Sequence, residues 1–275
     1  MSAKSPESPK SPTSSDDDTR PDVKQLLADA HDQGALSTRS LAALDLVDVG
    51  AQIQAGLGVT IDDVAASEVV LVTMMPDDSQ SIAQAGNTDA VRDGHNFVLE
   101  ALRSSRQSGE VLAHTRYLNG HVLCPYVALD QAAEMTPANY HPHLATPLYD
   151  QAAVVLGTVI AKSQELAQAG IAVRTVTLII TNGGDFGSTR MKPADVKAIV
   201  DDMLAQEHHI VAAMGISDGK TDFHAVFRAM GIPDRWVLTP GNSASEIRRA
   251  FAVFSRSAIR TSQGAQGAQL GGFSN

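Results

Sequence analysis

The stretch that decides the fold is EVVLVTMMPDDSQSI, residues 68–82. After Glu68 it has four consecutive apolar residues, Val69 to Val72, and a run of this kind is typical of a strand that is covered on both faces. Polar residues follow it, with Asp77, Ser79 and Ser81 at alternate positions. In open α/β sheets, ligands bind beyond the carboxyl ends of the strands. The stretch therefore predicts a buried strand that leads into a polar binding loop.

The chain after residue 68 alternates between predicted strands and helices, which is the pattern of a sheet with helices on both faces. Strands are predicted at residues 69–72, 111–118, 121–126, 175–181, 210–214 and 236–238. The second and third strands flank Asn119-Gly120, a pair that favours a tight hairpin because both residues tolerate positive φ. We therefore predict a doubly wound α/β fold with a mostly parallel six-stranded sheet and one antiparallel edge hairpin.

Four regions are predicted along the chain. Residues 67–258 form the α/β domain, and the apolar spacing within residues 22–66 predicts a helical appendage packed against it. Residues 1–21 contain repeated Ser-Pro pairs and a run of aspartates, so we expect a disordered tail. Residues 259–275, rich in Gly, Gln and Ala, are expected to form a flexible tail, in which Phe273 is a candidate docking anchor.

The composition argues against several classes of function. The formal net charge is -10 and the basic residues are dispersed, whereas a nucleic-acid partner needs a basic face. No apolar run approaches the roughly 20 residues that cross a bilayer, and no secretory signal is recognisable. The single cysteine, Cys124, fits a reducing compartment. We therefore expect a cytoplasmic protein with neither a membrane nor a nucleic acid as its partner.

Two further polar positions lie at the same predicted edge of the sheet. Thr146 precedes a long apolar helix, and Asn182 follows the strand at residues 175–181. Together with Asp77, Ser79 and Ser81 these residues offer hard oxygen donors, which suit magnesium or manganese. Taken alone, however, Asp-x-Ser-x-Ser after a strand is more often a helix cap than a metal site.

In chain order, segments 77–81, 146–150 and 178–183 resemble the metal-ion-dependent adhesion site (MIDAS) of von Willebrand factor type A (VWA) domains. They read Asp-x-Ser-x-Ser, Thr-Pro-Leu-Tyr-Asp and Leu-Ile-Ile-Thr-Asn-Gly. The resemblance covers residues 66–257 and implies a VWA fold. It also implies that Mg²⁺ or Mn²⁺ is held, directly or through water, by Asp77, Ser79, Ser81, Thr146 and Asn182. In such families a carboxylate of a partner protein completes the metal shell.

One residue departs from the family pattern, which usually has Asp where this chain has Asn182. An amide offers an oxygen but no charge. Either the site is weaker and more dependent on its partner, or Asp78 or Asp185 compensates, or the site is inactive. These two aspartates, with His141 and His143, are predicted to form the rim that meets the partner.

The resemblance implies a metal-dependent protein–protein interaction module, an adaptor or subunit of an intracellular assembly, and not an enzyme. Its partner would present an Asp or Glu carboxylate, and by analogy would be an AAA-type ATPase or a signalling enzyme. Two alternatives stay open: a metal-dependent enzyme acting on a small phosphoester, and a structural subunit with an inactive metal site. No general base is evident near Asp77, which counts against the enzyme.

Residues 215–221 follow a predicted strand and resemble a phosphate-binding P-loop. They have three residues between the two glycines where the P-loop has four, so the loop is too tight to wrap a phosphate. The adjacent His208 and His209 are not expected to bind one zinc ion together, because neighbouring side chains of a strand point to opposite faces. Neither nucleotide nor zinc binding is therefore expected.

Overall fold

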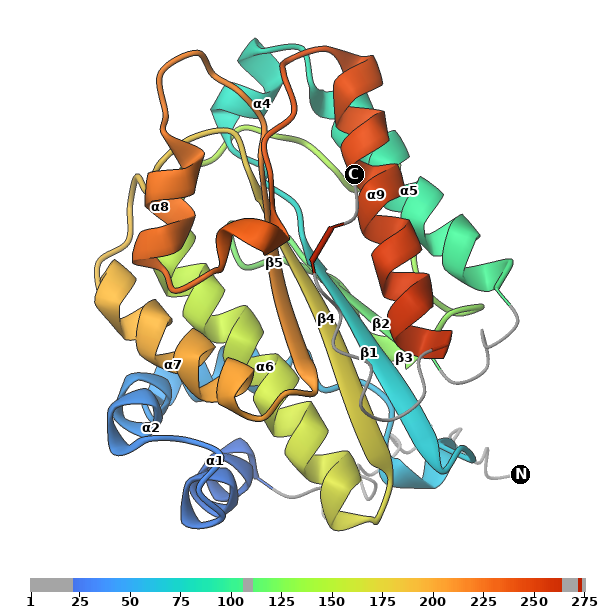
Figure 1. Ribbon diagram of the computed structural model, residues 1–275, viewed down its shortest axis with the longest axis vertical. Helices are drawn as coiled ribbons and strands as arrows, with labels where there is room; N and C mark the ends of the chain where they lie inside the picture. The colour runs from blue at the N-terminus through green and yellow to red at the C-terminus, as the bar shows by residue number, and fades with distance from the viewer. Residues whose placement is uncertain (1–21, 106–110, 264–271, 274–275) are drawn as a thin grey trace, which may run out of the picture.

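The computed structural model describes residues 22–105, 111–263 and 272–273. The tail predicted at residues 1–21 lies outside these ranges. Within them the chain forms one central sheet with helices packed on its faces (Figure 1). None of the described helices is long and apolar enough to cross a membrane.

The sheet of the described residues has six strands in the order β3-β2-β1-β4-β5-β6. Their bounds are β1 Glu68–Met75, β2 Val111–Arg116, β3 Val122–Ala128, β4 Ala172–Thr181, β5 His209–Gly215 and β6 Val237–Leu238. Neighbouring strands are parallel except β2 and β3, which form the antiparallel hairpin at one edge. The predicted fold class is confirmed. The order changes direction at β1 and β4, where the chain leaves one half of the sheet for the other.

Helices cover the sheet, so almost every residue of the central strands is buried. Their bounds are α4 Gln80–Gln84, α5 Thr88–Arg103, α6 Leu148–Gln168, α7 Pro193–Ala205, α8 Phe223–Ala229 and α9 Ala244–Gln263, with the short 3₁₀ helices η1 Ile61–Asp63 and η3 Asp234–Trp236. Helices α5 and α9 pack against each other, and α9 lies against β1 and β4. They approach so closely that a side chain at Gly94 would collide with the ring of Phe251. Helix α6 contacts the same two strands and packs beside α7.

The helical appendage consists of α1 Val23–Asp32, α2 Thr38–Leu44 and α3 Val47–Gln54. It packs on α6 and α7 (Figure 1). Gly157 of α6 allows this close packing, because a Cβ there would lie 2.7 Å from Cδ1 of Ile53 and 2.9 Å from Cδ2 of Leu44. Asp202 of α7 accepts hydrogen bonds from the backbone N and hydroxyl of Ser37, both at 2.8 Å, and from the Ser40 hydroxyl. The appendage therefore shares one core with the α/β domain.

The segment at residues 56–59 lies along β3, the strand at one end of the sheet. Tyr126 N donates to Gly56 O at 3.0 Å, and Val59 N donates to Tyr126 O at 2.8 Å. Gly58 lies between them at φ +63, where a side chain would collide with the Tyr126 backbone, so the close approach requires glycine. The segment thus covers part of the edge that β3 would otherwise expose.

The last helix is longer than the sequence pattern indicated. Ser243 caps its first turn: Glu246 N donates to the Ser243 hydroxyl at 3.3 Å, and that hydroxyl donates to the Glu246 carboxylate at 2.5 Å. The helix continues to Gln263, so the first five residues of the region predicted as a tail are helical.

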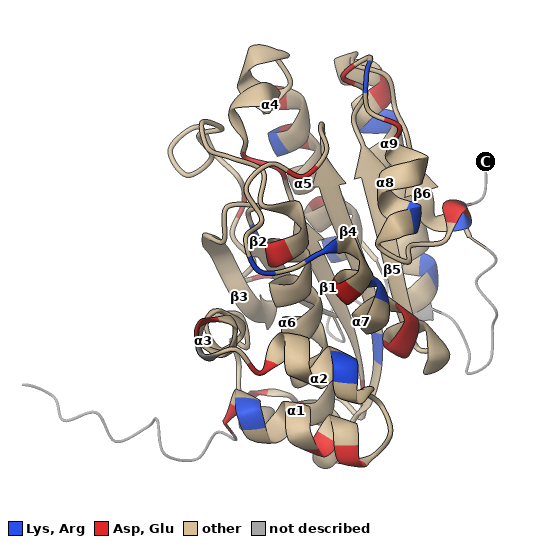
Figure 2. Cartoon of the chain, turned by 90° about the vertical axis from the view of Figure 1, so that its left-hand side faces the viewer, with Lys and Arg blue, Asp and Glu red and all other residues tan. Residues whose placement is uncertain are grey.

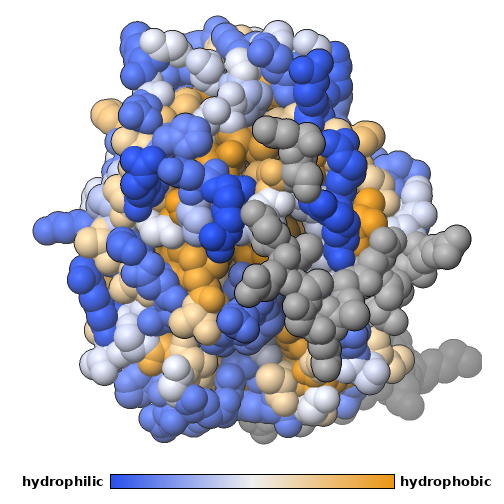
Figure 3. Space-filling model, viewed as in Figure 1, coloured by the Kyte–Doolittle hydropathy of each residue, from blue (hydrophilic) through white to orange (hydrophobic). Residues whose placement is uncertain are grey.

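On the side shown in Figure 2, acidic and basic residues are interspersed. The face shown in Figure 3 is mostly hydrophilic, with apolar residues visible near its middle.

Candidate metal centre

Three loops meet beyond the carboxyl ends of β1 and β4. Asp77 follows β1, Asn182 follows β4, and Thr146 lies just before α6. Two isolated β-bridges join the loops: Ser79 pairs with Leu144, and Thr146 pairs with Phe186. The three segments that are far apart in the sequence are therefore neighbours at the point where the strand order changes, which is where this fold class binds ligands.

Four of the five predicted metal ligands contact one another directly. The hydroxyls of Ser79 and Ser81 lie 2.8 Å apart, and the Ser81 hydroxyl donates to Oδ1 of Asn182 at 2.7 Å. Asn182 in turn donates its backbone N–H to Oδ2 of Asp77 at 3.1 Å. Thr146 is positioned by its backbone, since its N donates to Phe186 O at 3.0 Å. The structure thus places hydroxyl, amide and carboxylate oxygens in one cluster.

The Asp77 carboxylate is fully buried and held on both oxygens. Oδ1 accepts from the backbone N of Ser79 at 2.7 Å, and Oδ2 accepts from the Thr181 hydroxyl at 2.9 Å as well as from Asn182 N. The Tyr140 hydroxyl donates to the Asp77 carbonyl oxygen. Burial raises the pKa of Asp77, and these hydrogen bonds oppose that rise by favouring the charged form. The carboxylate is therefore fixed in place before any ligand arrives.

Asp78 is a second buried carboxyl beside the first, with 2% of its surface exposed. Its Oδ1 accepts from Asn119 N at 3.0 Å, which ties the hairpin turn to this loop, and its carbonyl accepts from His143 N at 3.0 Å. Burial, reinforced by the nearby Asp77 charge and opposed by the Asn119 hydrogen bond, raises the pKa of Asp78 to about 7. Among the ion pairs of the described residues, none includes Asp77 or Asp78.

These observations test whether a divalent cation fits the cluster. Two adjacent buried carboxyls without an ion-pair partner are costly, and a cation removes that cost. The donors are all oxygens, the ligand type of magnesium and manganese. Within the described ranges no group of three or more His, Cys, Asp or Glu residues could hold a metal. The candidate centre instead combines one carboxylate with hydroxyl and amide oxygens. These donors suit magnesium or manganese, so the residues present fit a divalent cation.

The four predicted rim residues differ in position. His141 and His143 lie exposed on the loop before α6, where the His143 ring contacts the His141 carbonyl. Asp78 is buried, as described above. Asp185 is partly buried, and its Oδ1 accepts from Tyr149 N at 3.3 Å and from the Ser188 hydroxyl. Asp185 thus helps to cap the first turn of α6.

Sequence reasoning missed two apolar residues at the centre. Leu144 and Phe186 are each half of one of the two β-bridges, and their exposed fractions are 41% and 75%. Few other large apolar residues of the described chain are comparably exposed. The only signal in the sequence was a phenylalanine between Asp185 and Gly187, inside an otherwise polar loop.

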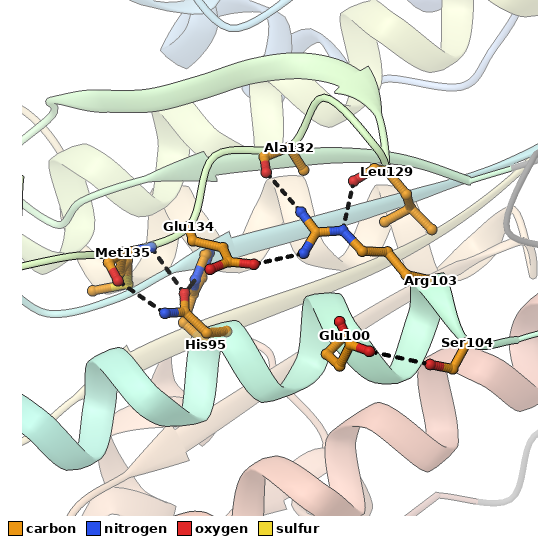
Figure 4. Close-up of polar contacts among 9 residues, drawn as sticks. His95, Glu100, Arg103, Ser104, Leu129, Ala132, Glu134 and Met135 are labelled. Carbon is orange, nitrogen blue, oxygen red and sulfur yellow. Dashed lines mark hydrogen bonds and ion pairs between the residues drawn. The ribbon is translucent and has the colours of Figure 1, made fainter.

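The loop that carries Thr146 is anchored to α5 well before it reaches the centre (Figure 4). The Arg103 guanidinium donates to Leu129 O at 3.0 Å and to Ala132 O at 2.8 Å, and it pairs with Glu134 at 2.8 Å. The Asn96 side chain exchanges two 2.8 Å hydrogen bonds with the backbone of Met135. These contacts therefore hold this part of the loop in place, largely through its backbone.

The loop after β5 does not present its amides to a phosphate. Oδ1 of Asp218 accepts from Lys220 N at 2.8 Å and from Thr221 N at 2.7 Å, so these donors are already used within the loop. The Thr221 hydroxyl also donates to Asp218, at 2.7 Å. The loop therefore closes on its own carboxylate.

Comparison with solved structures identifies the fold. A pilus adhesin, SpaC from Lactobacillus rhamnosus GG, matches 70% of this chain with a TM-score of 0.50 and 12% identity in its open conformation. The VWA domain of SpRpn10 matches 72% of this chain, with a TM-score of 0.41, 9% identity and 98% of its own length covered. The matched region spans 30% of the adhesin's length. No protein-family model and no curated protein matches the sequence.

With its strand order, edge hairpin and flanking helices, the chain has a VWA-like fold. At this level of identity the matches establish the fold alone.

Proposed function

We propose that this chain is a protein-interaction module that binds a carboxylate of its partner through a divalent metal, Mg²⁺ or Mn²⁺. The observation that carries the proposal is the pair of buried carboxyls, Asp77 and Asp78, beside a cluster of oxygen donors and without an ion-pair partner in the described chain. Asp77, Ser79, Ser81, Thr146 and Asn182 would hold the ion. When bound, it would supply a Lewis-acidic position for an acidic side chain of the partner.

The exposed apolar residues beside the centre support a macromolecular partner. Leu144 and Phe186 belong to the same bridges that assemble the centre, so a partner carboxylate bound there would lie near both side chains. Exposed large apolar side chains are typical contacts of protein interfaces. We infer that the partner presents its Asp or Glu next to an apolar side chain, which covers Phe186.

The module is proposed to be non-enzymatic and cytoplasmic. The buried Cys124 carries a free thiol, as expected for a reducing compartment. By analogy with the family that it resembles, an AAA-type ATPase or a signalling enzyme is the proposed kind of partner.

Calorimetric titration with MgCl₂ tests the metal, on the wild type and on Asp77→Ala, with and without acetate as a carboxylate probe. We expect the wild type to bind magnesium, acetate to tighten that binding, and Asp77→Ala to bind neither. The control is Asp32→Ala, which removes a carboxylate that is 81% exposed and belongs to the appendage, and which should bind like the wild type.

Thermal unfolding in the same buffers guards against a binding reaction without heat, since saturation to 100 times Kd stabilises by about 2.7 kcal/mol. If magnesium and manganese neither bind nor stabilise the wild type, the proposed metal dependence is wrong. If magnesium binds but a magnesium-dependent pull-down retains no protein that EDTA releases, the centre exists without the proposed interaction.

A further inference from the structure

The two described residues near the C-terminus, Gly272 and Phe273, return to the body of the protein. Phe273 N donates to the carbonyl of Arg235 at 3.0 Å. The Phe273 ring meets the Trp236 indole edge-on, with centroids 5.1 Å apart and an interplanar angle of 82°. Edge-to-face aromatic pairs at this separation are favourable beyond the area that they bury. Phe273 is half-buried against the main core, so the contact is both polar and apolar.

The residue before the phenylalanine fits only as glycine. Gly272 has φ +119, which L side chains rarely adopt, and a Cβ there would lie 2.9 Å from both Cβ and O of Arg235. The contact therefore selects two features in sequence: a residue without a side chain, and then an aromatic ring. A nonspecific collapse of an apolar tail would not require the first of these.

The contact lies at η3, directly before the edge strand of the sheet. Trp236 ends η3 and is followed directly by β6, the last strand of the sheet. Among the described residues β6 pairs only with β5. Peptides often bind sheet edges through main-chain hydrogen bonds, with pockets for alternate side chains. Here the main-chain hydrogen bond, to Arg235 O, and the ring contact, with Trp236, both come from η3, next to that edge.

We propose that Arg235 and Trp236 form a binding site for a peptide with a glycine followed by an aromatic residue, and that the chain's own Gly272–Phe273 occupies it in cis. The proposal is independent of the metal centre, because none of its contacts involves the loops that carry Asp77, Thr146 or Asn182. A partner that carries the same pair of residues would compete with the tail for the site.

Trp236 is the only tryptophan of the chain, and 3% of its surface is exposed, so its fluorescence reports on the site. In the full-length protein, Phe273→Ala should shift the emission to longer wavelengths and increase quenching by acrylamide. Gly272→Ala, which keeps the ring, should do the same, whereas Phe273→Tyr should behave like the wild type. Phe97→Ala, which removes a half-exposed phenylalanine of α5, is the matched control and should leave the emission unchanged.

The free site of the Phe273→Ala protein should bind a synthetic peptide of residues 268–275, and saturation should restore the wild-type emission. The same peptide with Gly272→Ala should bind at least about tenfold more weakly, because the close contact with Arg235 is lost. Wild-type emission in both tail variants, or equal binding of the two peptides, would overturn the proposal. A wild-type dimer in sedimentation that Phe273→Ala abolishes would overturn the assignment of the occupant in cis.

Discussion

Buried charges occur near both ends of α6, and the chain treats them differently. In its C-terminal half, Lys162 and Glu165 are fully buried and form an ion pair at 2.8 Å, and Lys162 also donates to Val59 O. At its N-terminal end, Asp77 and Asp78 are equally buried, but no ion pair of the described residues includes them. A fold that places a lysine beside one buried carboxylate can neutralise buried charge. Buried carboxyls that have no basic side chain paired with them are then a better indicator of a bound ligand than buried carboxyls that do.

Replacing the lysine of the buried Lys162–Glu165 ion pair should have the largest effect on stability. Lys162→Met leaves Glu165 buried without its lysine, and breaking a buried pair in this way costs about 3–5 kcal/mol. Urea denaturation monitored by circular dichroism measures the loss. The double variant Lys162→Met/Glu165→Leu should recover most of it, since both charges are gone. A loss below about 1 kcal/mol for the single variant would mean that the pair contributes little.

Two buried histidines show a third arrangement: they stay neutral, so they place no charge in the core. Burial lowers the pKa of His95 to about 4 and that of His114 to about 3. The unfolded chain therefore binds these protons first, and the stability that the neutral histidines confer is lost as pH falls below about 6.5. For His114 the loss between pH 6 and pH 4 is about 2 kcal/mol.

Urea midpoints measured across that range test the effect on His114 as a difference between variants. Between pH 6 and pH 4 the wild type should lose more stability than His114→Gln, and His141→Gln, an exposed control, should follow the wild type. If the stability of the wild type and of His114→Gln changed with pH in parallel, the pKa of His114 would be the same in the folded and unfolded states.

An added carboxylate tests the candidate metal centre itself. Asn182→Asp supplies the charge that Asn182 lacks, so the magnesium dissociation constant should fall about tenfold in calorimetry. The metal-free protein should become less stable, because a third carboxyl joins Asp77 and Asp78. Gln54→Glu, at the exposed end of α3, adds the same charge elsewhere and should change neither quantity. An unchanged magnesium affinity would place Asn182 outside the coordination sphere.

The smallest effect is expected at the exposed ring beside the centre. Phe186 contributes to the β-bridge through its backbone, so Phe186→Ala should alter stability by less than about 0.5 kcal/mol and leave magnesium affinity unchanged. Phe186→Pro removes the N–H that donates to Thr146 O at 2.8 Å, and it should weaken magnesium binding. Loss of magnesium binding in the alanine variant would assign the ring itself to the centre.

The sheet could be predicted because its strands leave a strong local signal. Strands buried on both faces need continuous apolar runs, and Asn119-Gly120 marks the hairpin turn, where Gly120 has φ +96. Asp77 and Asn182 were likewise found from their positions after apolar strands. By contrast, the exposure of Phe186 and Leu144 depends on loops paired over long sequence distances. An apolar residue in one loop cannot reveal such pairing by itself.

The burial of Asp78 shows the same limit. Its position beside Asp77 suggested a surface residue, but its hydrogen bond with Asn119 draws it beneath the hairpin turn. The seat of Phe273 also depends on a partner, Trp236, which lies 37 positions earlier in the chain.

The segment at residues 56–59 has a consequence for how copies of this protein behave at high concentration. An uncovered outer strand is a template on which another chain can add its own strand, and natural sheets that lack protection there tend to aggregate. By occupying the backbone groups of Tyr126, residues Gly56 and Val59 remove part of that template. A side chain larger than hydrogen at position 58 would push the segment away. The first visible effect of such a side chain would then be poor solubility and precipitation on storage.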